Sequence, residues 1–217
     1  MAGTLTSVNL DAYRSATYFL DSDSAEVRAF TARVVGATAD PATRAALLFE
    51  QVRESIRYSP FAISPDPADY RASAVIGSGS TWCVPKAVLL TAAARAAGIP
   101  ARLGFADVRN HLTSPALRAR MGDAADVFVY HGYSELFLDG RWVKAAPTFD
   151  SGVCARNGVT PITFDGKQDA LLHEYSPDGR FMEYVADRGV HADLPLKEIM
   201  STLLATYPVM RGGPSTV

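Results

Sequence analysis

Cys83 is the residue of this chain best placed for covalent chemistry. It is one of only two cysteines in 217 residues, and it follows the small-residue loop Gly77–Ser80 at the start of an apolar, helix-like run. A thiol at a helix N-terminus meets unpaired N–H groups and the positive end of the helix dipole, which favour the thiolate. Those N–H groups can also receive the oxyanion formed when sulfur attacks a carbonyl. The competing interpretation is a small buried filler, as many free cysteines are.

A nucleophilic cysteine needs a base, and the chain has four histidines. His131 lies within an apolar, strand-like run, where an imidazole without a partner would be costly. We therefore predict that His131 is the base for Cys83, against the alternative of a core histidine with a structural hydrogen bond. His111 is expected on the rim of a loop, and His173 and His191 have no comparable context.

A predicted hairpin relates His131 to a carboxylate. The run that contains His131 is joined to a second β-rich run by Asp139 and Gly140, a strong two-residue hairpin signal. This register places His131 opposite Thr148, and because side chains on one face alternate, Asp150 shares the face of His131. We predict that Asp150 orients the imidazole. The competing interpretation is a solvated carboxylate that begins the following turn.

Other residues near these positions receive lesser roles. Trp82, Gly79 and Ser80 are predicted to contact substrate, although Trp82 could instead pack under the helix. Glu135 shares the His131 face but lies about 13 Å along the strand, so it is predicted to be a structural hydrogen-bond or salt-bridge partner. Cys154, expected in a Gly-rich loop without a helix start, is treated as incidental.

The elements that position these residues indicate an α+β fold. The first third is predicted to be helical, and the run from Pro85 to Ala97 has too few polar residues for a surface helix, so it is predicted to be a buried central helix. Helices followed by strands favour packing on an antiparallel sheet. The expected elements are helices at 25–35, 41–56, 85–97 and around 115–121, strands at 101–108, 127–138 and 141–149, a hairpin around 176–179, and a last helix from about 193.

Composition excludes several classes of protein. With 48% hydrophobic residues, 20% charged residues and a net charge of −2, neither disorder nor a nucleic-acid partner is indicated. No run approaches the ~20 apolar residues of a membrane span, and the first residues lack a secretory signal, so we expect a cytoplasmic protein without membrane contact. Two cysteines favour neither a metal quartet nor a structural disulfide, and no metal or cofactor is expected.

Two stretches resemble the bacterial transglutaminase-like proteins of the papain-like cysteine-enzyme superfamily. They are YRASAVIGSGSTWCVPKAVLLTAAARAAGIPARLGFADVRN (70–110) and HGYSELFLDGRWVKAAPTFD (131–150). In family order they carry a cysteine opening a helix, a GIPAR exit, a histidine–aromatic–glutamate strand and a Gly-x-Trp turn. The resemblance implies a single papain/transglutaminase-like domain over 1–217, with a helical part (1–60), a catalytic core (70–150) and C-terminal strands and helix (151–217).

The resemblance also implies an activity and exposes one departure. It implies a Cys-His-Asp triad, with Cys83 as nucleophile and His131 as base, that acts on a peptide, protein or small amide through a thioester. Transamidation, deamidation and peptide hydrolysis all remain open, and nothing indicates calcium or an oligomeric state. The family Asp of Asp-Pro-Thr is replaced by Ala146. The alternative is therefore a non-catalytic binding or scaffold module, against which stands the presence of both Cys83 and His131.

Overall fold

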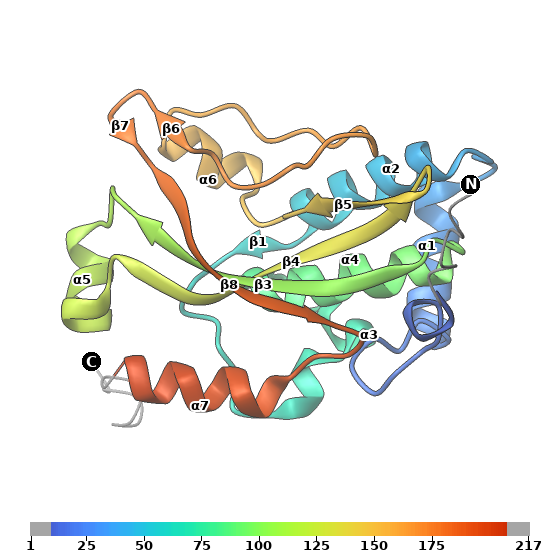
Figure 1. Cartoon of the computed structure of the whole chain (residues 1–217), viewed down its shortest axis with the longest axis horizontal. Coiled ribbons are helices and arrows are strands. Elements are labelled where there is room, and N and C mark those ends of the chain that lie inside the picture. The colour runs from blue at the N-terminus through green and yellow to red at the C-terminus, as the bar shows by residue number, and fades with distance from the viewer. Residues whose placement is uncertain (1–9, 208–217) are drawn as a thin grey trace, which may run out of the picture.

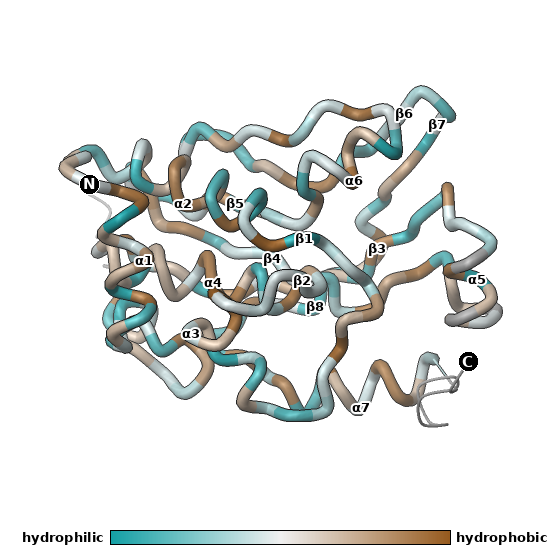
Figure 2. Tube along the Cα trace, turned by 180° about the vertical axis from the view of Figure 1, so that it is seen from behind, coloured by the Kyte–Doolittle hydropathy of each residue, from teal (hydrophilic) through white to brown (hydrophobic). Residues whose placement is uncertain are grey.

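The computed structural model describes residues 10–207 and has two main layers. A four-stranded antiparallel sheet in the order β5-β4-β3-β8 forms one layer, and α4 packs on it with α1, α2 and α3 around it (Figure 1; Figure 2). This confirms the predicted α+β fold. The helices are α1 (Ala25–Val35), α2 (Pro41–Ser55), α3 (Ala72–Val75), α4 (Cys83–Ala96), α5 (Pro115–Met121), α6 (Ser151–Arg156) and α7 (Leu196–Thr206).

The strands and short helices complete the described chain. The main sheet contains β3 (Ala101–Asn110), β4 (Val127–Leu138), β5 (Arg141–Ala145) and β8 (Met182–His191). Two small pairs are β1 (Arg57–Tyr58) with β2 (Ser80–Thr81), and β6 (Tyr175–Ser176) with β7 (Gly179–Arg180). Short 3₁₀ helices are η1 (Asp11–Tyr13), η2 (Pro67–Tyr70) and η3 (Gly122–Ala124). In residues 10–207 no helix is both long enough and apolar enough to span a bilayer.

Local sequence signals explain the N-terminal helices. The Asp40 carboxylate accepts the Thr43 N–H at 2.8 Å and caps α2, with Pro41 in the first turn, where it needs no hydrogen-bond donor. Ser24 caps α1 in the same way, through the N–H of Val27. The predicted ranges of both helices are confirmed, α2 ending one residue earlier than expected.

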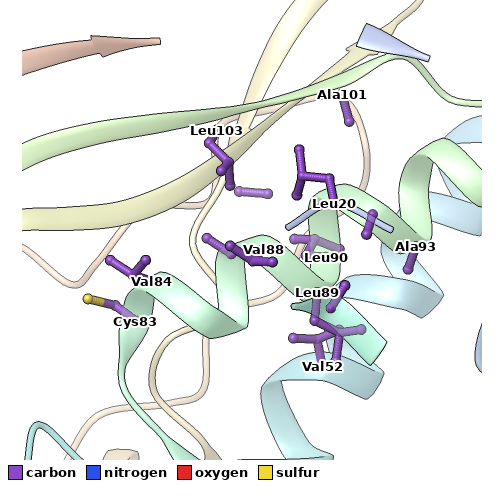
Figure 3. Close-up of a cluster of buried hydrophobic side chains, with 14 of the residues drawn as sticks. Leu20, Val52, Cys83, Val84, Val88, Leu89, Leu90, Ala93, Ala101 and Leu103 are labelled. Atoms are coloured by element: carbon purple, nitrogen blue, oxygen red, sulfur yellow. The ribbon is translucent and has the colours of Figure 1, made fainter. Parts of the chain in front are cut away.

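The central helix α4 is buried from Cys83 to Arg95. Its aliphatic side chains contact the sheet on one side and α2 on the other, as Val84, Val88 and Leu89 show in Figure 3. A polar side chain is tolerated at this depth because it is hydrogen-bonded. For example, the Arg95 guanidinium donates to three main-chain carbonyls, those of Ala101, Ser15 and Ala192.

The β4–β5 hairpin has the predicted register near its turn. Leu138 pairs with Arg141, and Asp139 and Gly140 have φ of 49° and 81°, the left-handed values that a tight type I′ turn requires. The predicted extension of the second strand to Phe149 is wrong, because β5 ends at Ala145. Pro147 has no N–H to donate, and the Ala146 N–H instead donates to the carbonyl of Ala170 at 2.8 Å.

Candidate active site

Cys83 is the first residue of α4 and sits where this helix meets β4. Its sulfur points away from the aliphatic cluster that surrounds the rest of the helix (Figure 3). The backbone N–H groups of Gly132 on β4, of Val84 and of Cys83 itself all act to lower the pKa of the thiol. The predicted donor-rich environment at the helix N-terminus is therefore present, and β4 adds one donor that the sequence did not reveal.

Gly132 allows this close approach of helix and strand. A Cβ at position 132 would lie 3.0 Å from Cα of Val84 and 3.1 Å from its Cγ2, closer than a backbone neighbour normally permits. Glycine therefore lets the first turn of α4 lie directly against β4. From this position the N–H of Gly132 acts to lower the pKa of the Cys83 thiol.

Burial, however, dominates the ionisation of Cys83. The side chain is 7% exposed, and burial raises the pKa of its thiol to about 11, although the backbone donors and the Lys86 ammonium act in the opposite direction. Burial therefore opposes the thiolate that the helix N-terminus is expected to favour. Loss of water around the sulfur outweighs the helix N-terminus.

His131 lies in β4, directly before Gly132, in the strand that the sequence predicted. It is 3% exposed, and burial alone lowers its pKa to about 3, so the imidazole is neutral at pH 7. The Tyr184 ring packs edge-on against it at 5.7 Å between centroids. Within the described residues its Nε2 has no hydrogen-bond partner, which is rare for a buried polar atom and typical of a functional one.

Asp150 does not make the predicted contact with His131 in the described structure. Its Oδ1 accepts the Val153 N–H at 3.0 Å and caps α6, while its Oδ2 accepts the Tyr58 N–H at 2.6 Å. The hydrogen bonds from Tyr58 and Val153 and the charge of Lys86 lower the pKa of Asp150, although burial acts to raise it. The register argument fails here because β4–β5 pairing ends at Ser134–Ala145, before it reaches His131.

Ala146, at the family aspartate position, is buried in a small apolar cluster with Ala106 and Tyr133. Ala106 is the register partner of His131 on β3, so position 146 lies on the His131 side of the sheet. Leu171 and Tyr184 cover the cluster. The Tyr184 ring contacts the imidazole, and Asp187, the β8 partner of Ala106, lines the same cavity as Ala106, Tyr133 and Tyr184.

Lys86 is a residue of this site whose role the sequence analysis missed. Its side chain is fully buried, and Nζ donates to the carbonyls of Arg53 (2.9 Å), Ile56 (2.7 Å) and Thr148 (3.0 Å). Three donors require the ammonium form, since a neutral amine has two. Burial lowers the pKa of Lys86 to about 8, while Asp150 and Glu54 oppose this shift. A single lysine in the first turn of an otherwise apolar helix was the available signal.

The residues predicted to bind substrate lie around a cavity of about 410 Å³ beside the start of α4. Trp82 and Ser80 line it, as does Tyr70, whereas Gly79 belongs to the same loop but does not. The Trp82 indole N–H lies near the Tyr70 hydroxyl without a hydrogen bond of acceptable geometry, and it is buried. The Trp82 side chain therefore lines the cavity while its N–H is buried without a hydrogen-bond acceptor.

The remaining predicted residues take structural positions. Glu135 accepts two bonds from Arg102, at 2.7 and 2.6 Å, which confirms its predicted role as a salt-bridge partner. Cys154 is wrongly predicted to lie in a loop: it is fully buried inside α6, because Asp150 supplies an N-cap. The other histidines have separate partners: His111 contacts Glu183, His173 contacts the Thr160 carbonyl, and His191 packs on Phe105.

Comparison with family models identifies residues 28–147, more than half of the chain, as a transglutaminase-like superfamily core. The chain belongs to the transglutaminase-like superfamily. The match includes both Cys83 and His131 and ends directly after Ala146 and Pro147. No curated protein gave a significant match. Among residues 10–207, no three or more His, Cys, Asp and Glu side chains are grouped as metal ligands.

One solved structure supports the same fold for this transglutaminase-like chain, and two others show weaker similarity. A Cytophaga hutchinsonii protein, provisionally named a cysteine protease, is 15% identical with a TM-score of 0.50, covering 83% of this chain and 46% of that one. A provisionally named protease from Parabacteroides distasonis is 17% identical with a TM-score of 0.42, and the match covers 62% of this chain and 26% of that one. The periplasmic domain of TgpA from Pseudomonas aeruginosa, bound to ethylmercury, is 19% identical with a TM-score of 0.38, and the match covers 56% of this chain and 42% of that one. The chain spans less than half the length of each.

Proposed function

We propose that this chain is a cysteine-nucleophile enzyme that acts on an amide or peptide carbonyl through a thioester. The observation that carries the proposal is the junction of α4 and β4: Gly132 lies against the first turn of α4, which Cys83 begins, and His131 is the adjacent residue on the strand. The superfamily membership supports this assignment. Cys83 is the proposed nucleophile and His131 the proposed base.

The proposed reaction starts from a neutral pair. With the pKa of Cys83 near 11 and that of His131 near 3, both groups are uncharged at pH 7 in the closed structure. As sulfur attacks the carbonyl carbon, the thiol proton passes to His131 and the carbonyl electrons move to oxygen, near the N–H groups that begin α4. The C–N bond then breaks, and the amine leaves with the proton from His131. Water or a second amine attacks the thioester, which releases the thiol.

The proposal assigns the acyl chain to the cavity beside Trp82. Because Cys83 is 7% exposed and His131 is 3% exposed, a substrate must displace neighbouring side chains before it reaches the sulfur. The cavity is lined by Trp82 and Pro85, which flank Cys83 closely in the sequence. The Trp82 N–H, which has no hydrogen-bond acceptor, can donate to a substrate carbonyl once the neighbouring side chains are displaced. We expect Trp82→Phe, which removes this donor, to raise KM more than it lowers kcat.

Two cysteine variants test the proposal. The full chain would be incubated with casein and a fluorescent primary amine for transfer, and with casein alone for released ammonia and new amino termini. We expect at least one activity, lost in Cys83→Ser and in His131→Gln and retained in Cys154→Ser. Equal activity of Cys83→Ser and the parent would exclude the proposal, as would loss in Cys154→Ser alone.

The alternative, a non-catalytic binding module, is favoured by one observation. Ala146 stands at the family aspartate position, and the Asp150 carboxylate is occupied by two backbone donors, so neither of these two positions supplies a carboxylate to the His131 ring. The Ala146→Asp variant distinguishes an enzyme from a non-catalytic binding module. A gain in turnover marks the parent as an enzyme with a weakened triad, whereas an inactive parent and an inactive Ala146→Asp variant favour the module.

A further inference from the structure

The strand segment directly before His131 is deformed. Ala106 pairs with His131 and Val108 with Phe128, so two residues of β4, Val129 and Tyr130, lie opposite the single residue Asp107. This is a β-bulge, which leaves backbone groups without ladder partners and re-aims the side chains that follow. Tyr130 has φ of 56°, a left-handed value that is costly for a bulky residue and usual for glycine.

Side chains from other elements satisfy both free N–H groups of the bulge. The Asp107 carboxylate accepts the Tyr130 N–H at 3.1 Å, and the hydroxyl of Tyr207, which follows α7, accepts the Val129 N–H at 3.0 Å. The same hydroxyl donates to the carbonyl of Val127. The deformation is therefore held by specific bonds and is not a local irregularity.

Arg188 fixes Asp107 in turn. Its guanidinium donates to both carboxylate oxygens, at 2.9 and 2.7 Å, and lies over the Tyr130 ring at 5.0 Å. Arg188 reaches this place because β8 has its own register shift, which sets Arg188 and Gly189 opposite Phe105. Strands on both sides of β3 are thus bulged at the same level, and one ion pair joins them.

We infer that Asp107, held by Arg188, is a positioning residue for the active site: it sets the bulge that presents His131 and the Gly132 N–H to Cys83. The inference rests on the proposed function, since it concerns the same sulfur. Asp107 is 7% exposed and touches the backbone of Tyr130, one residue before His131. Loss of its carboxylate frees the Tyr130 N–H and removes the reason for the left-handed backbone.

The effect would be read from the ionisation of Cys83. If the strand relaxes, the Gly132 N–H moves away from the sulfur, the thiolate loses a donor, and the thiol pKa rises. A hydrogen bond to a charged group corresponds to about ten-fold or more in an equilibrium constant. The other titratable groups coupled to the Cys83 thiol are Lys86 on α4, Tyr58 on β1, Tyr184 on β8 and Tyr207 after α7, and His131 is the residue before Gly132 on β4.

The experiment measures the iodoacetamide alkylation rate of Cys83 against pH by mass spectrometry, in the Cys154→Ser background. We expect Asp107→Ala to react about ten-fold more slowly below the thiol pKa, and Asp107→Asn, which keeps an oxygen for the Tyr130 N–H, to recover most of the rate. Glu135→Gln is the matched control, because it breaks the Arg102 ion pair of the same two strands. The control should keep the parent profile.

Further readouts keep the outcome decisive. Should Asp107→Ala fail to fold, Tyr207→Phe removes the Val129 acceptor alone and should shift the profile in the same direction. Hydrogen exchange of the Tyr130 and Gly132 amides should be faster in each variant that slows alkylation. Parent-like profiles in Asp107→Ala and Tyr207→Phe, or an equal shift in Glu135→Gln, would overturn the inference. Turnover that survives Cys83→Ser would instead reject the proposed function and leave the alkylation comparison valid.

Discussion

The two ends of the β4–β5 hairpin are built in different ways. Near Asp139 and Gly140 the strands pair regularly by backbone bonds, and the register follows from the turn. Near His131, pairing has ended and side chains from distant parts of the chain, Lys86 and Asp107 among them, bind the free backbone groups. Single side chains should therefore matter far more at the site end than at the turn end.

Lys86→Met should give the largest difference between the two ends. It leaves three buried carbonyls without their donor, and we expect unfolding free energy to fall by about 4 kcal/mol. Lys144→Met, in the regularly paired part of β5, removes an ammonium that lies over the Tyr133 ring, with an expected cost below about 1 kcal/mol. Urea denaturation measures both. Similar values for the two variants would contradict the comparison.

His131 should make the site end sensitive to acid. The unfolded chain binds a proton at this residue near pH 6.5, whereas the folded chain excludes it down to about pH 3. Between these values the unfolded state holds more protons, so stability is lost as pH falls, by about 3 kcal/mol between pH 6.5 and 4 from this group. His131→Gln should flatten the dependence of unfolding free energy on pH. If unfolding free energy depends on pH equally in His131→Gln and the parent, His131 is not a buried, neutral imidazole.

Gly132→Ala tests the close approach of α4 and β4. The new Cβ would meet the Val84 backbone at 3.0 Å, and we expect a loss of about 2 to 3 kcal/mol together with slower alkylation of Cys83. Gly77→Ala is the control, since a Cβ there meets nothing within 4 Å and its φ is not left-handed. Thermal and urea unfolding give the comparison. A tolerated alanine at position 132 would mean that the helix can shift.

Substitution of Asp150 should give the smallest of the four losses of stability, and its effect on turnover tests whether Asp150 also orients His131. Asp150→Ala removes the α6 cap and the acceptor for Tyr58 N–H, with an expected loss of about 2 kcal/mol. Asp150→Asn keeps one of the two acceptor oxygens and should lose less. If Asp150 only caps α6, Asp150→Asn should keep the parent turnover. A large drop in kcat with near-parent stability would restore Asp150 as the orienter of His131.

Sequence patterns were sufficient where structure depends on neighbours in the chain. Asp40 and Pro41 mark the start of α2, Asp139 and Gly140 determine the hairpin, and the apolar run after Cys83 identifies the buried helix. Each of these structures is determined by residues that lie within a few positions of one another in the sequence. The placement of Cys83 at the start of that helix follows from the same local information.

The site was less predictable because its bonds join residues far apart in sequence. The carbonyl of Thr148 is 62 positions from Lys86, and Asp107 reaches Tyr130 across 23 positions. The expected path of Asp150 assumed continued pairing past Ala145, which Pro147 prevents. The pKa of Cys83 depends on burial by elements that no local pattern specifies.

The burial of Cys83 also bears on its chemical durability. Peroxides and other oxidants react with the thiolate, and repeated oxidation ends in sulfinic and sulfonic acids that rarely revert. A sulfur that is 7% exposed, with a thiol pKa near 11, presents almost no thiolate to them at neutral pH. A nucleophile at this position, as proposed above, is therefore shielded from oxidation until a substrate displaces the side chains that cover it.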